Sequence, residues 1–193
     1  MLLAAGSSTR LGKPKQLLVY NGKSFLQHTI EIIIASGIKP FIIVLGSNAD
    51  LLNPNIDSPD GIVVLNNNWN DGMATSINAG LTALLERYPS IGNVIFMTCD
   101  QPFVTKFLLN ELIITHQQTG NSIVASSYDD ALGVPALFSK TVFPELLQLK
   151  GDAGAKKIIL QHIDELATVS FPKGEIDIDT VEDYETLLKN KNE

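Results

Sequence analysis

The segment LAAGSSTRLGKPK, residues 3–15, joins a short apolar stretch to a loop of small, polar and basic residues. The apolar stretch, Leu2–Ala5, predicts a strand that ends where Gly6 begins the loop. Small residues let a ligand approach the backbone closely, and exposed amides and hydroxyls can donate hydrogen bonds to phosphate oxygens. Arg10 can bind two phosphate oxygens at once, and Lys15 supplies a point charge. The segment therefore predicts a strand followed by a phosphate-binding loop, with a solvated surface loop as the alternative that composition leaves open.

Beyond this loop, apolar runs typical of buried strands alternate with helical patterns. The expected strands are Leu2–Ala5, Phe41–Leu45, Ile62–Leu65, Val94–Thr98 and Ser122–Ser126, followed by the shorter Ala136–Phe138, Leu166–Phe171 and Ile176–Ile178. The expected helices are Ser24–Ser36, Met73–Arg87, one that Thr105 caps and that ends near Gly120, Ala153–His162 and Val181–Asn190. This alternation predicts an α/β fold with a parallel sheet covered on both faces. No linker or repeat divides the chain, so residues 1–193 are expected to form a single domain.

Composition excludes several classes of protein. The 14 Lys and Arg residues are outnumbered by 21 Asp and Glu residues, which gives a net charge of −7 and argues against nucleic acid as a partner. No apolar run approaches the ~20 residues that a membrane span needs. The N-terminal residues lack the pattern of a signal peptide, and the one cysteine, Cys99, suits a reducing compartment. We therefore expect a cytoplasmic protein with no membrane or nucleic-acid partner.

Three aspartates near the ends of expected strands are candidate metal ligands. Asp100 follows the strand Val94–Thr98, at the sheet edge where ligands bind in open α/β folds. A carboxylate there can hold Mg²⁺, which prefers oxygen ligands and substrate phosphates. Asp177 and Asp179 alternate with an apolar residue, so in a strand both carboxylates would face the same side. The alternative for Asp100 is a cap of the next turn, and for the other two an acidic helix start with Thr180 as its cap.

A polar segment that contains the chain's one tryptophan, NNNWNDGMATS at residues 66–76, follows another expected strand and leads into a helix. Its amides could hydrogen-bond to a planar heterocycle on which Trp69 stacks. A polar loop with a structural tryptophan is equally open.

The loop at residues 3–15 resembles the LAAGxSxRxGxxK signature of the nucleotidyltransferase family with a GT-A-like fold. Every fixed position is matched, at Leu3, Ala4, Ala5, Gly6, Ser8, Arg10, Gly12 and Lys15. The resemblance implies a three-layer α/β/α, Rossmann-like fold with a mainly parallel mixed sheet. It also implies that the loop wraps the triphosphate of an incoming nucleotide. The nucleotide-binding residues that it implies in the loop are Leu3, Ala4, Ala5, Gly6, Ser7, Ser8, Arg10 and Lys15.

The same resemblance implies catalytic roles for Arg10 and Lys15 on the phosphates and for Asp100 in its Asp-Gln-Pro setting. Mg²⁺ is the implied cofactor, with Asp100 as its first ligand. The second ligand is expected in the segment that begins at Asp177; Asp179 is preferred, and the sequence does not separate the two.

Residues 66–76 resemble a segment of the branch that includes the molybdenum cofactor cytidylyltransferases, with matches at Asn66, Trp69, Gly72, Met73 and Ser76. In that branch the segment borders the nucleotide and reaches towards the acceptor. The implied nucleotide-binding residues are Asn66, Gly72 and Ser76. The segments GVPALF at 133–138 and GDAGAK at 151–156 also match the branch. The implied acceptor-binding residues are Trp69, Gly133, Pro135 and Asp152.

The resemblance covers Leu2 to Leu188 and implies a Mg²⁺-dependent transfer of CMP from CTP to a phosphate-bearing acceptor, with release of pyrophosphate. Molybdopterin is the implied acceptor, and a molybdoenzyme is a candidate partner for the product. Two alternatives remain open. One is a sugar- or polyol-phosphate cytidylyltransferase such as the methylerythritol phosphate enzyme, against which the Trp69 segment argues. The other is a non-catalytic nucleotide- or cofactor-binding module, against which the complete set of Arg10, Lys15, Asp100 and Asp179 argues.

Overall fold

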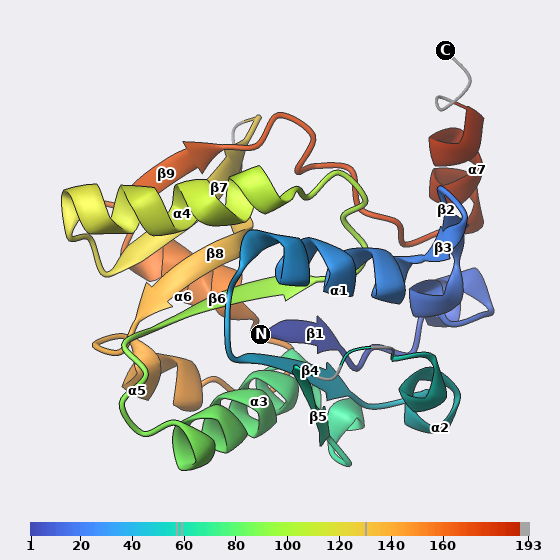
Figure 1. Ribbon diagram of the computed structural model, residues 1–193, viewed down its shortest axis with the longest axis horizontal. Coiled ribbons are helices and arrows are strands. Elements are labelled where there is room, and N and C mark those ends of the chain that lie inside the picture. The colour runs from blue at the N-terminus through green and yellow to red at the C-terminus, as the bar shows by residue number, and fades with distance from the viewer. Residues whose placement is uncertain (57, 59, 130, 190–193) are drawn as a thin grey trace.

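A seven-stranded sheet forms the middle layer of the computed structural model, which describes residues 1–56, 58, 60–129 and 131–189 (Figure 1). In spatial order its strands are β5 (Gly61–Leu65), β4 (Phe41–Leu45), β1 (Leu2–Ala4), β6 (Asn93–Thr98), β8 (Ala131–Ser139), β7 (Ile123–Tyr128) and β9 (Ala167–Ser170). The helices are α1 (Phe25–Ser36), α2 (Ala49–Leu52), α3 (Met73–Arg87), α4 (Lys106–Thr119), α5 (Phe143–Leu147), α6 (Ala155–Gln161) and α7 (Val181–Lys189). A small separate hairpin joins β2 (Val19–Tyr20) to β3 (Lys23–Ser24).

The sheet is mixed because β8 runs antiparallel to both of its neighbours, β6 and β7. All other neighbouring strands are parallel. This arrangement confirms the predicted three-layer α/β fold with a mainly parallel sheet. The sequence underestimated β8, for which only Ala136–Phe138 was expected. Those residues pair with both β6 and β7, whereas the first part of β8 pairs with β7 alone.

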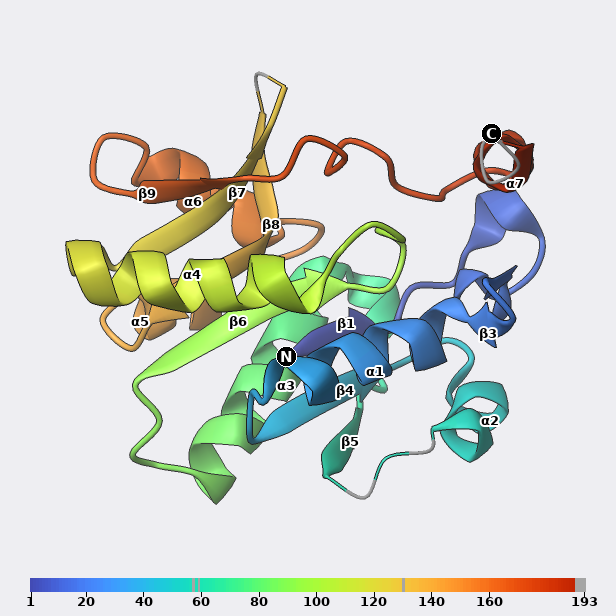
Figure 2. The ribbon, with the colours of Figure 1, turned by 45° about the horizontal axis from the view of Figure 1, so that its top comes forward.

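The two faces of the sheet bury two separate apolar cores. Alternate side chains of β1 point to opposite faces, so Leu3 packs with α3, α5 and α6 while Leu2 packs with α1 and α4. Figure 2 shows α1 and α4 side by side over their face of the sheet. Since β4 is buried on both sides, its sequence is an unbroken apolar run.

The helix ends follow the signals in the sequence. The Thr105 side chain accepts a hydrogen bond from the Leu108 amide at 3.2 Å, and α4 ends at Gly120, which has a φ of 70°. Ser24 caps α1 in the same way, with Gly37 at the other end. Within the described residues, no helix is both long and apolar enough to cross a membrane.

The segment that precedes α7 is not a strand, so the prediction of a strand at Ile176–Ile178 was wrong. The Ile178 amide donates to the carbonyl of Asp100, which lies just beyond the end of β6, at 3.0 Å. The Ile178 side chain is fully buried in a third, smaller core that includes Leu11 and Leu187. Apolar burial in this small core, not strand pairing, accounts for the apolar residue between two acids.

Helix α7 returns the end of the chain to the N-terminal loop. Thr180 caps it as predicted, because the Asp183 amide donates to Thr180 Oγ1 at 3.2 Å and the Thr180 amide donates to Asp183 Oδ2 at 2.8 Å. The last residue expected in this helix, Asn190, lies outside the described residues. In Figures 1 and 2, α7 lies beside the β2–β3 hairpin, and Tyr184 Oη donates to the Val19 carbonyl at 2.7 Å.

The two-sided core predicts different costs for the same substitution on α3 and α6. Leu81 in α3 is 0% exposed and Leu160 in α6 is 50% exposed. We expect Leu81→Ala to lower the free energy of unfolding by about 2–5 kcal/mol, because it leaves a cavity, and Leu160→Ala to lower it by less than about 1 kcal/mol. Urea unfolding followed by circular dichroism measures both, and equal losses would contradict this assignment of the core.

Candidate active site

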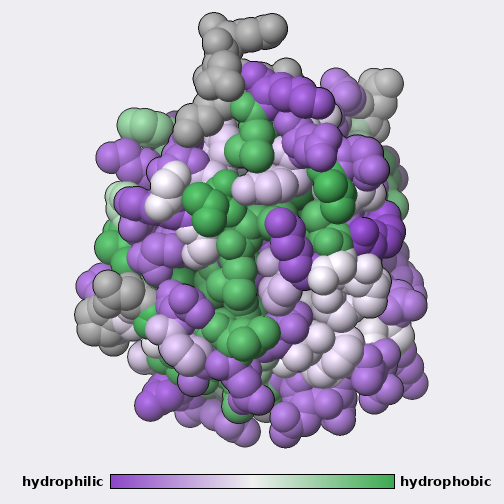
Figure 3. Space-filling model, turned by 90° about the vertical axis from the view of Figure 1, so that its right-hand side faces the viewer, coloured by the Kyte–Doolittle hydropathy of each residue, from purple (hydrophilic) through white to green (hydrophobic). Residues whose placement is uncertain are grey.

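The carboxyl ends of β1, β4 and β6 open onto one side of the molecule, at the right of Figure 1. Figure 3 looks directly at this side, where a band of hydrophobic surface runs through the middle of a hydrophilic rim. In open α/β sheets, ligands bind at this edge. The predicted loop, the predicted aspartates and the tryptophan segment all reach it.

Lys15 forms a bridge between two of the predicted metal ligands. Its Nζ lies 2.7 Å from Asp100 Oδ2 and 2.6 Å from Asp179 Oδ1. Arg10 Nη2 adds a contact to Asp179 Oδ2 at 2.8 Å. The side chains of Lys15 and Asp100 are 14% and 17% exposed, whereas that of Arg10 is 70% exposed. The structure therefore brings together four residues to which the resemblance gives a catalytic role or the preferred metal-binding role: Arg10, Lys15, Asp100 and Asp179.

The pKa shifts of Lys15 and Asp179 both favour the charged form of the side chain. Burial alone lowers the pKa of Lys15, but the charges and hydrogen bonds of Asp100 and Asp179 outweigh it and raise that pKa above its ordinary value. The hydrogen bond from Lys15 is the foremost cause that lowers the pKa of Asp179. An ammonium at this position can contact a bound anion, and the carboxylates can contact a bound cation.

Gln16 holds the loop in shape, and sequence reasoning missed it. It is 1% exposed, and its Nε2 donates to the carbonyls of Ala4 at 2.9 Å and Gly6 at 3.1 Å. Ser8 closes the same loop, since its Oγ accepts from the Lys15 amide at 3.0 Å. The Ser8 hydroxyl therefore has a contact within the loop, and the Ala4 carbonyl points to Gln16. A glutamine in a loop without periodicity gave no signal beyond its position next to Lys15.

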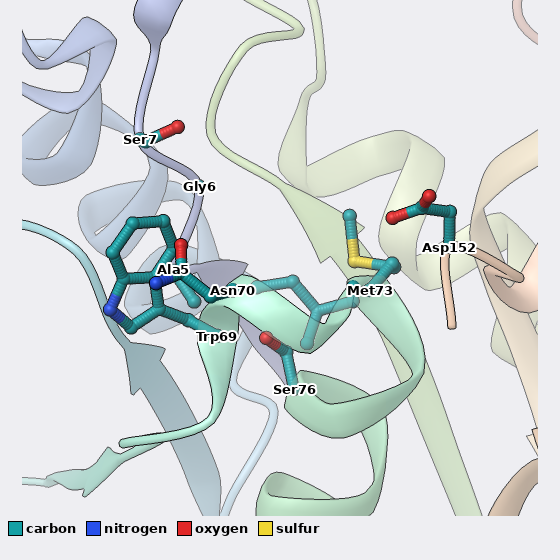
Figure 4. Close-up of a pocket in the computed structure, with 10 residues that line it drawn as sticks. Ala5, Gly6, Ser7, Trp69, Asn70, Met73, Ser76 and Asp152 are labelled. Atoms are coloured by element: carbon teal, nitrogen blue, oxygen red, sulfur yellow. The ribbon is translucent and has the colours of Figure 1, made fainter. Parts of the chain in front are cut away.

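The first pocket, a cavity of about 450 Å³, lies between the loop and the start of α3 (Figure 4). It is lined by Leu3, Ala5, Gly6, Ser7, Trp69, Asn70, Gly72, Met73, Ser76 and Asp152. In Figure 4 the Trp69 ring lies beside Ala5 and Asn70, and Asp152 lies beyond Met73, on the far side from Trp69. Most residues predicted to bind the nucleotide thus share one cavity with two that were predicted to bind the acceptor. Ala4 does not line it and is 3% exposed.

Asn66 lies outside the lining of this pocket and hydrogen-bonds to the first turn of α3. It is 5% exposed, its Nδ2 donates to Thr75 Oγ1 at 2.8 Å and to Ser76 Oγ at 2.9 Å, and its Oδ1 accepts from the Asn68 amide at 2.9 Å. The structure places Asn66 as a brace between the strand end and the helix start, outside the lining of the pocket.

Gly72 brings two distant segments together at the pocket wall. Its φ of +103° is one that side chains rarely allow, and a Cβ built on it would lie 2.3 Å from the carbonyl carbon and oxygen of Gly151. The Ala74 amide donates to the same Gly151 carbonyl at 3.0 Å. This close approach places Asp152 at the first turn of α3.

The second pocket, a cavity of about 460 Å³, begins on the other side of Asp100. Its lining residues are Thr98, Asp100, Gln101, Tyr128, Asp129, Ala131, Val134, Lys156, Gly174, Glu175 and Asp177. Burial, followed by the negative charges of Asp100 and Asp179, raises the pKa of Asp177. The expectation that Asp177 and Asp179 face one side was wrong, because the segment is not a strand. Asp179 contacts Lys15, while Asp177 lines this second pocket.

Gly133 and Pro135 are buried in β8 and line neither pocket. A Cβ on Gly133 would lie 1.9 Å from Tyr128 Oη, so this glycine makes room for a tyrosine that does line the second pocket. The Pro135 carbonyl accepts from Ser126 Oγ at 2.6 Å. Sequence reasoning missed Tyr128, which lies in a strand pattern that gives no sign of function.

The donors at the bridge suit a hard divalent cation. Among the residues that the structure describes, no group of three or more His, Cys, Asp or Glu side chains gathers as a self-sufficient metal site. Mg²⁺ commonly takes one or two protein carboxylates together with substrate phosphates and water. Asp100 and Asp179 beside a phosphate-binding loop fit that pattern.

Known proteins share sequence and fold with this chain. Residues 1–166 match the family described as the MobA-like NTP transferase domain. The chain is 30% identical to nicotine blue oxidoreductase of Paenarthrobacter nicotinovorans, over 97% of this chain and 95% of that protein. It is 27% identical to the purine catabolism protein PucB of Bacillus subtilis, over 98% and 95% of the two chains. The crystal structure of Rv0371c from Mycobacterium tuberculosis in complex with manganese matches with a TM-score of 0.79 and 30% identity, over 97% and 96% of the two chains.

The chain belongs to the MobA-like NTP transferase family, and it is a nucleotidyltransferase. The names of these two relatives mention neither a nucleotide nor a molybdenum cofactor, so they do not identify the substrate of this chain. A probable molybdenum cofactor guanylyltransferase of Flavobacterium johnsoniae is 27% identical over 74% of this chain and 69% of that protein.

The contact between Gly72 and Gly151 predicts a stability effect. We expect Gly72→Ala to lower the free energy of unfolding by about 2–4 kcal/mol, because it adds both backbone strain and a clash. Gly92→Ala is the matched control, since a Cβ there meets no atom within 4 Å and its φ is ordinary. The control should change stability by less than about 1 kcal/mol in the same urea titration. A Gly72→Ala variant as stable as the control would show that the turn at Gly151 moves aside freely.

Proposed function

We propose that the chain is a Mg²⁺-dependent cytidylyltransferase that transfers CMP from CTP to a phosphate-bearing acceptor, with molybdopterin as the first acceptor to test. The observation that carries the proposal is the convergence of Lys15, Arg10, Asp100 and Asp179 beside the N-terminal loop. Of these four residues, Asp100 also lines the second pocket. The family resemblance supplies CTP through the LAAG form of the loop, and molybdopterin through the Trp69 segment.

In this proposal the two pockets hold the two substrates. Trp69 and Asp152, which the resemblance placed on the acceptor side, line the first pocket and are therefore reassigned to the nucleotide side. The nucleoside of CTP occupies the first pocket, between Ala5 and Trp69, and its phosphates extend along the loop towards Lys15 and Arg10. The acceptor occupies the second pocket, where Lys156 is a cation that can bind its phosphate. Asp100 supports this division because it lines the second pocket and also contacts Lys15.

The reaction is a single displacement at the α-phosphorus of the nucleotide. An oxygen of the acceptor phosphate forms the new bond to that phosphorus, the bond to the bridging oxygen breaks, and pyrophosphate leaves with the electron pair. Such chemistry depends on positioning and charge neutralisation more than on a protein nucleophile. Lys15 and Arg10 offset negative charge that develops on the leaving pyrophosphate.

Asp100 and Asp179 would hold Mg²⁺ at the junction of the two pockets. When bound, the ion neutralises charge on the phosphate oxygens and fixes their orientation. The manganese in the Rv0371c structure supports a divalent cation in this family, and the two carboxylates supply the oxygen ligands that such a cation prefers.

Calorimetry with CTP, GTP, ATP and UTP, each with and without Mg²⁺, tests the nucleotide directly. We expect CTP to bind at least about tenfold more tightly than the others when Mg²⁺ is present, a difference of about 1.4 kcal/mol. A preference for GTP would replace the cytidylyl assignment with a guanylyl one. If no triphosphate binds, the proposed function fails.

Substitution of Asp100 gives the most direct test of turnover. We expect Asp100→Asn to lower the rate of pyrophosphate release from CTP and molybdopterin by about 10²–10³-fold, since it removes a charge that positions the metal and Lys15. Circular dichroism should show an unchanged fold, because Asp100 is at the site edge and contributes little apolar volume. Asp60→Asn is the control, since Asp60 contacts the exposed Lys39 at 2.7 Å. Equal rates for the two variants would contradict the role of Asp100.

A further inference from the structure

The Lys15 ammonium lies between the carboxylates of Asp100 and Asp179. Three of their four oxygens contact cationic side chains: Asp100 Oδ2 and Asp179 Oδ1 contact Lys15, and Asp179 Oδ2 contacts Arg10. Both carboxylates are needed as ligands in the proposed function. A metal ion that uses the oxygens bound to Lys15 must therefore displace its ammonium group.

The local charges work against this displacement. The negative charges of Asp100 and Asp179 are matched by the positive charges of Lys15 and Arg10, so an approaching divalent ion meets little net attraction from the four groups together. The charge-assisted hydrogen bonds of Lys15 are among the stronger contacts that a carboxylate makes. Metal alone is therefore expected to bind weakly.

A triphosphate changes this balance. It brings several negative oxygens to the loop that carries both cations, and Lys15 stands on a flexible four-carbon stem. Arg10, whose side chain is 70% exposed, is free to turn with it. When the ammonium transfers its contacts from the carboxylates to the phosphates, the carboxylate oxygens become available to the metal.

We infer that Lys15 blocks the metal site in the free protein and that the triphosphate opens it by drawing Lys15 away, so that nucleotide and metal bind cooperatively. The inference rests on the proposed function for the identity of the anion. It goes further by giving Lys15 a second position and by setting the order in which the site assembles. Because coupling between two ligands is reciprocal, bound metal also strengthens nucleotide binding.

A structural role for Lys15 makes the opposite prediction. If Lys15 only joins the N-terminal loop to the segment before α7 and stays on the carboxylates, its removal loosens that junction and weakens any metal binding. The direction of the change in metal affinity therefore separates the two roles.

The experiment measures the binding of Mn²⁺ alone, by the electron paramagnetic resonance signal of the free ion, to the wild type, Lys15→Met and Lys13→Met. We expect Lys15→Met to bind Mn²⁺ at least about tenfold more tightly than the wild type, since it removes charged hydrogen bonds that compete with the metal. Lys13→Met removes the same charge from the same loop, but the Lys13 ammonium lies over the Tyr184 ring, 5.6 Å from its centre. It should stay within about twofold of the wild type. Lys15→Gln is the second variant if Lys15→Met does not fold by circular dichroism.

A second measurement repeats the Mn²⁺ titration with saturating CTP. The tightening caused by CTP should be at least about tenfold smaller in Lys15→Met than in the wild type, because the variant has no lysine to draw away. A titration of CTP with Mn²⁺ but no protein gives the direct binding of Mn²⁺ by CTP, which is accounted for in both proteins.

Two results overturn the inference. In the first, the Lys15 variants bind Mn²⁺ no more tightly than the wild type, which includes the case in which no protein binds it. In the second, CTP tightens Mn²⁺ binding equally in Lys15→Met and in the wild type. If no triphosphate binds, the proposed function and the opening step fail together. The Mn²⁺ comparison without nucleotide still decides whether Lys15 blocks the site.

Discussion

The contact of one ammonium with two carboxylates determines how this site is assembled. Lys15, Asp100 and Asp179 come from the N-terminal loop, the end of β6 and the segment before α7, so the bridge joins parts of the chain that are 85 and 164 residues apart. Partly buried carboxylates at close range repel one another unless a cation lies between them. Positive charge between them, whether from Lys15 or from a metal, relieves this repulsion.

The fold supplies the rigidity that this charge arrangement needs. Parallel strands β1 and β6 are neighbours, so the start of the loop and Asp100 are fixed at the same sheet edge. Asp179 is positioned differently, because α7, which follows it, packs on the β2–β3 hairpin and on the small core around Ile178. The C-terminal segment is thus as much a part of the site as the loop at the N-terminus.

The sequence predicted the elements with local signals and missed those that depend on tertiary packing. The unbroken apolar run of β4 and the cap at Thr105 were read directly, because a fully buried strand and a capped helix each leave a local pattern. The bracing role of Gln16 and the placement of Tyr128 were not predicted, since each depends on a contact that leaves no local pattern. Gln16 contacts the Ala4 carbonyl, and Tyr128 fits against Gly133 across the hairpin of β7 and β8. Similarly, Asp177 and Asp179 could not be separated while their segment was taken for a strand.

The packing of Ile178 explains why Asp177 and Asp179, so close in sequence, lie in different surroundings. Its buried side chain and its amide bond to the Asp100 carbonyl hold the chain at one point, with Asp177 directed to the second pocket and Asp179 to Lys15. The same short segment therefore forms a wall of the proposed acceptor pocket and a ligand of the proposed metal site. Because Asp100 is also shared by the two, a change on the nucleotide side that moves Lys15 alters the electrostatic field in the acceptor pocket. The order of assembly inferred for the metal is thus also a way for bound nucleotide to prepare the place where the acceptor binds.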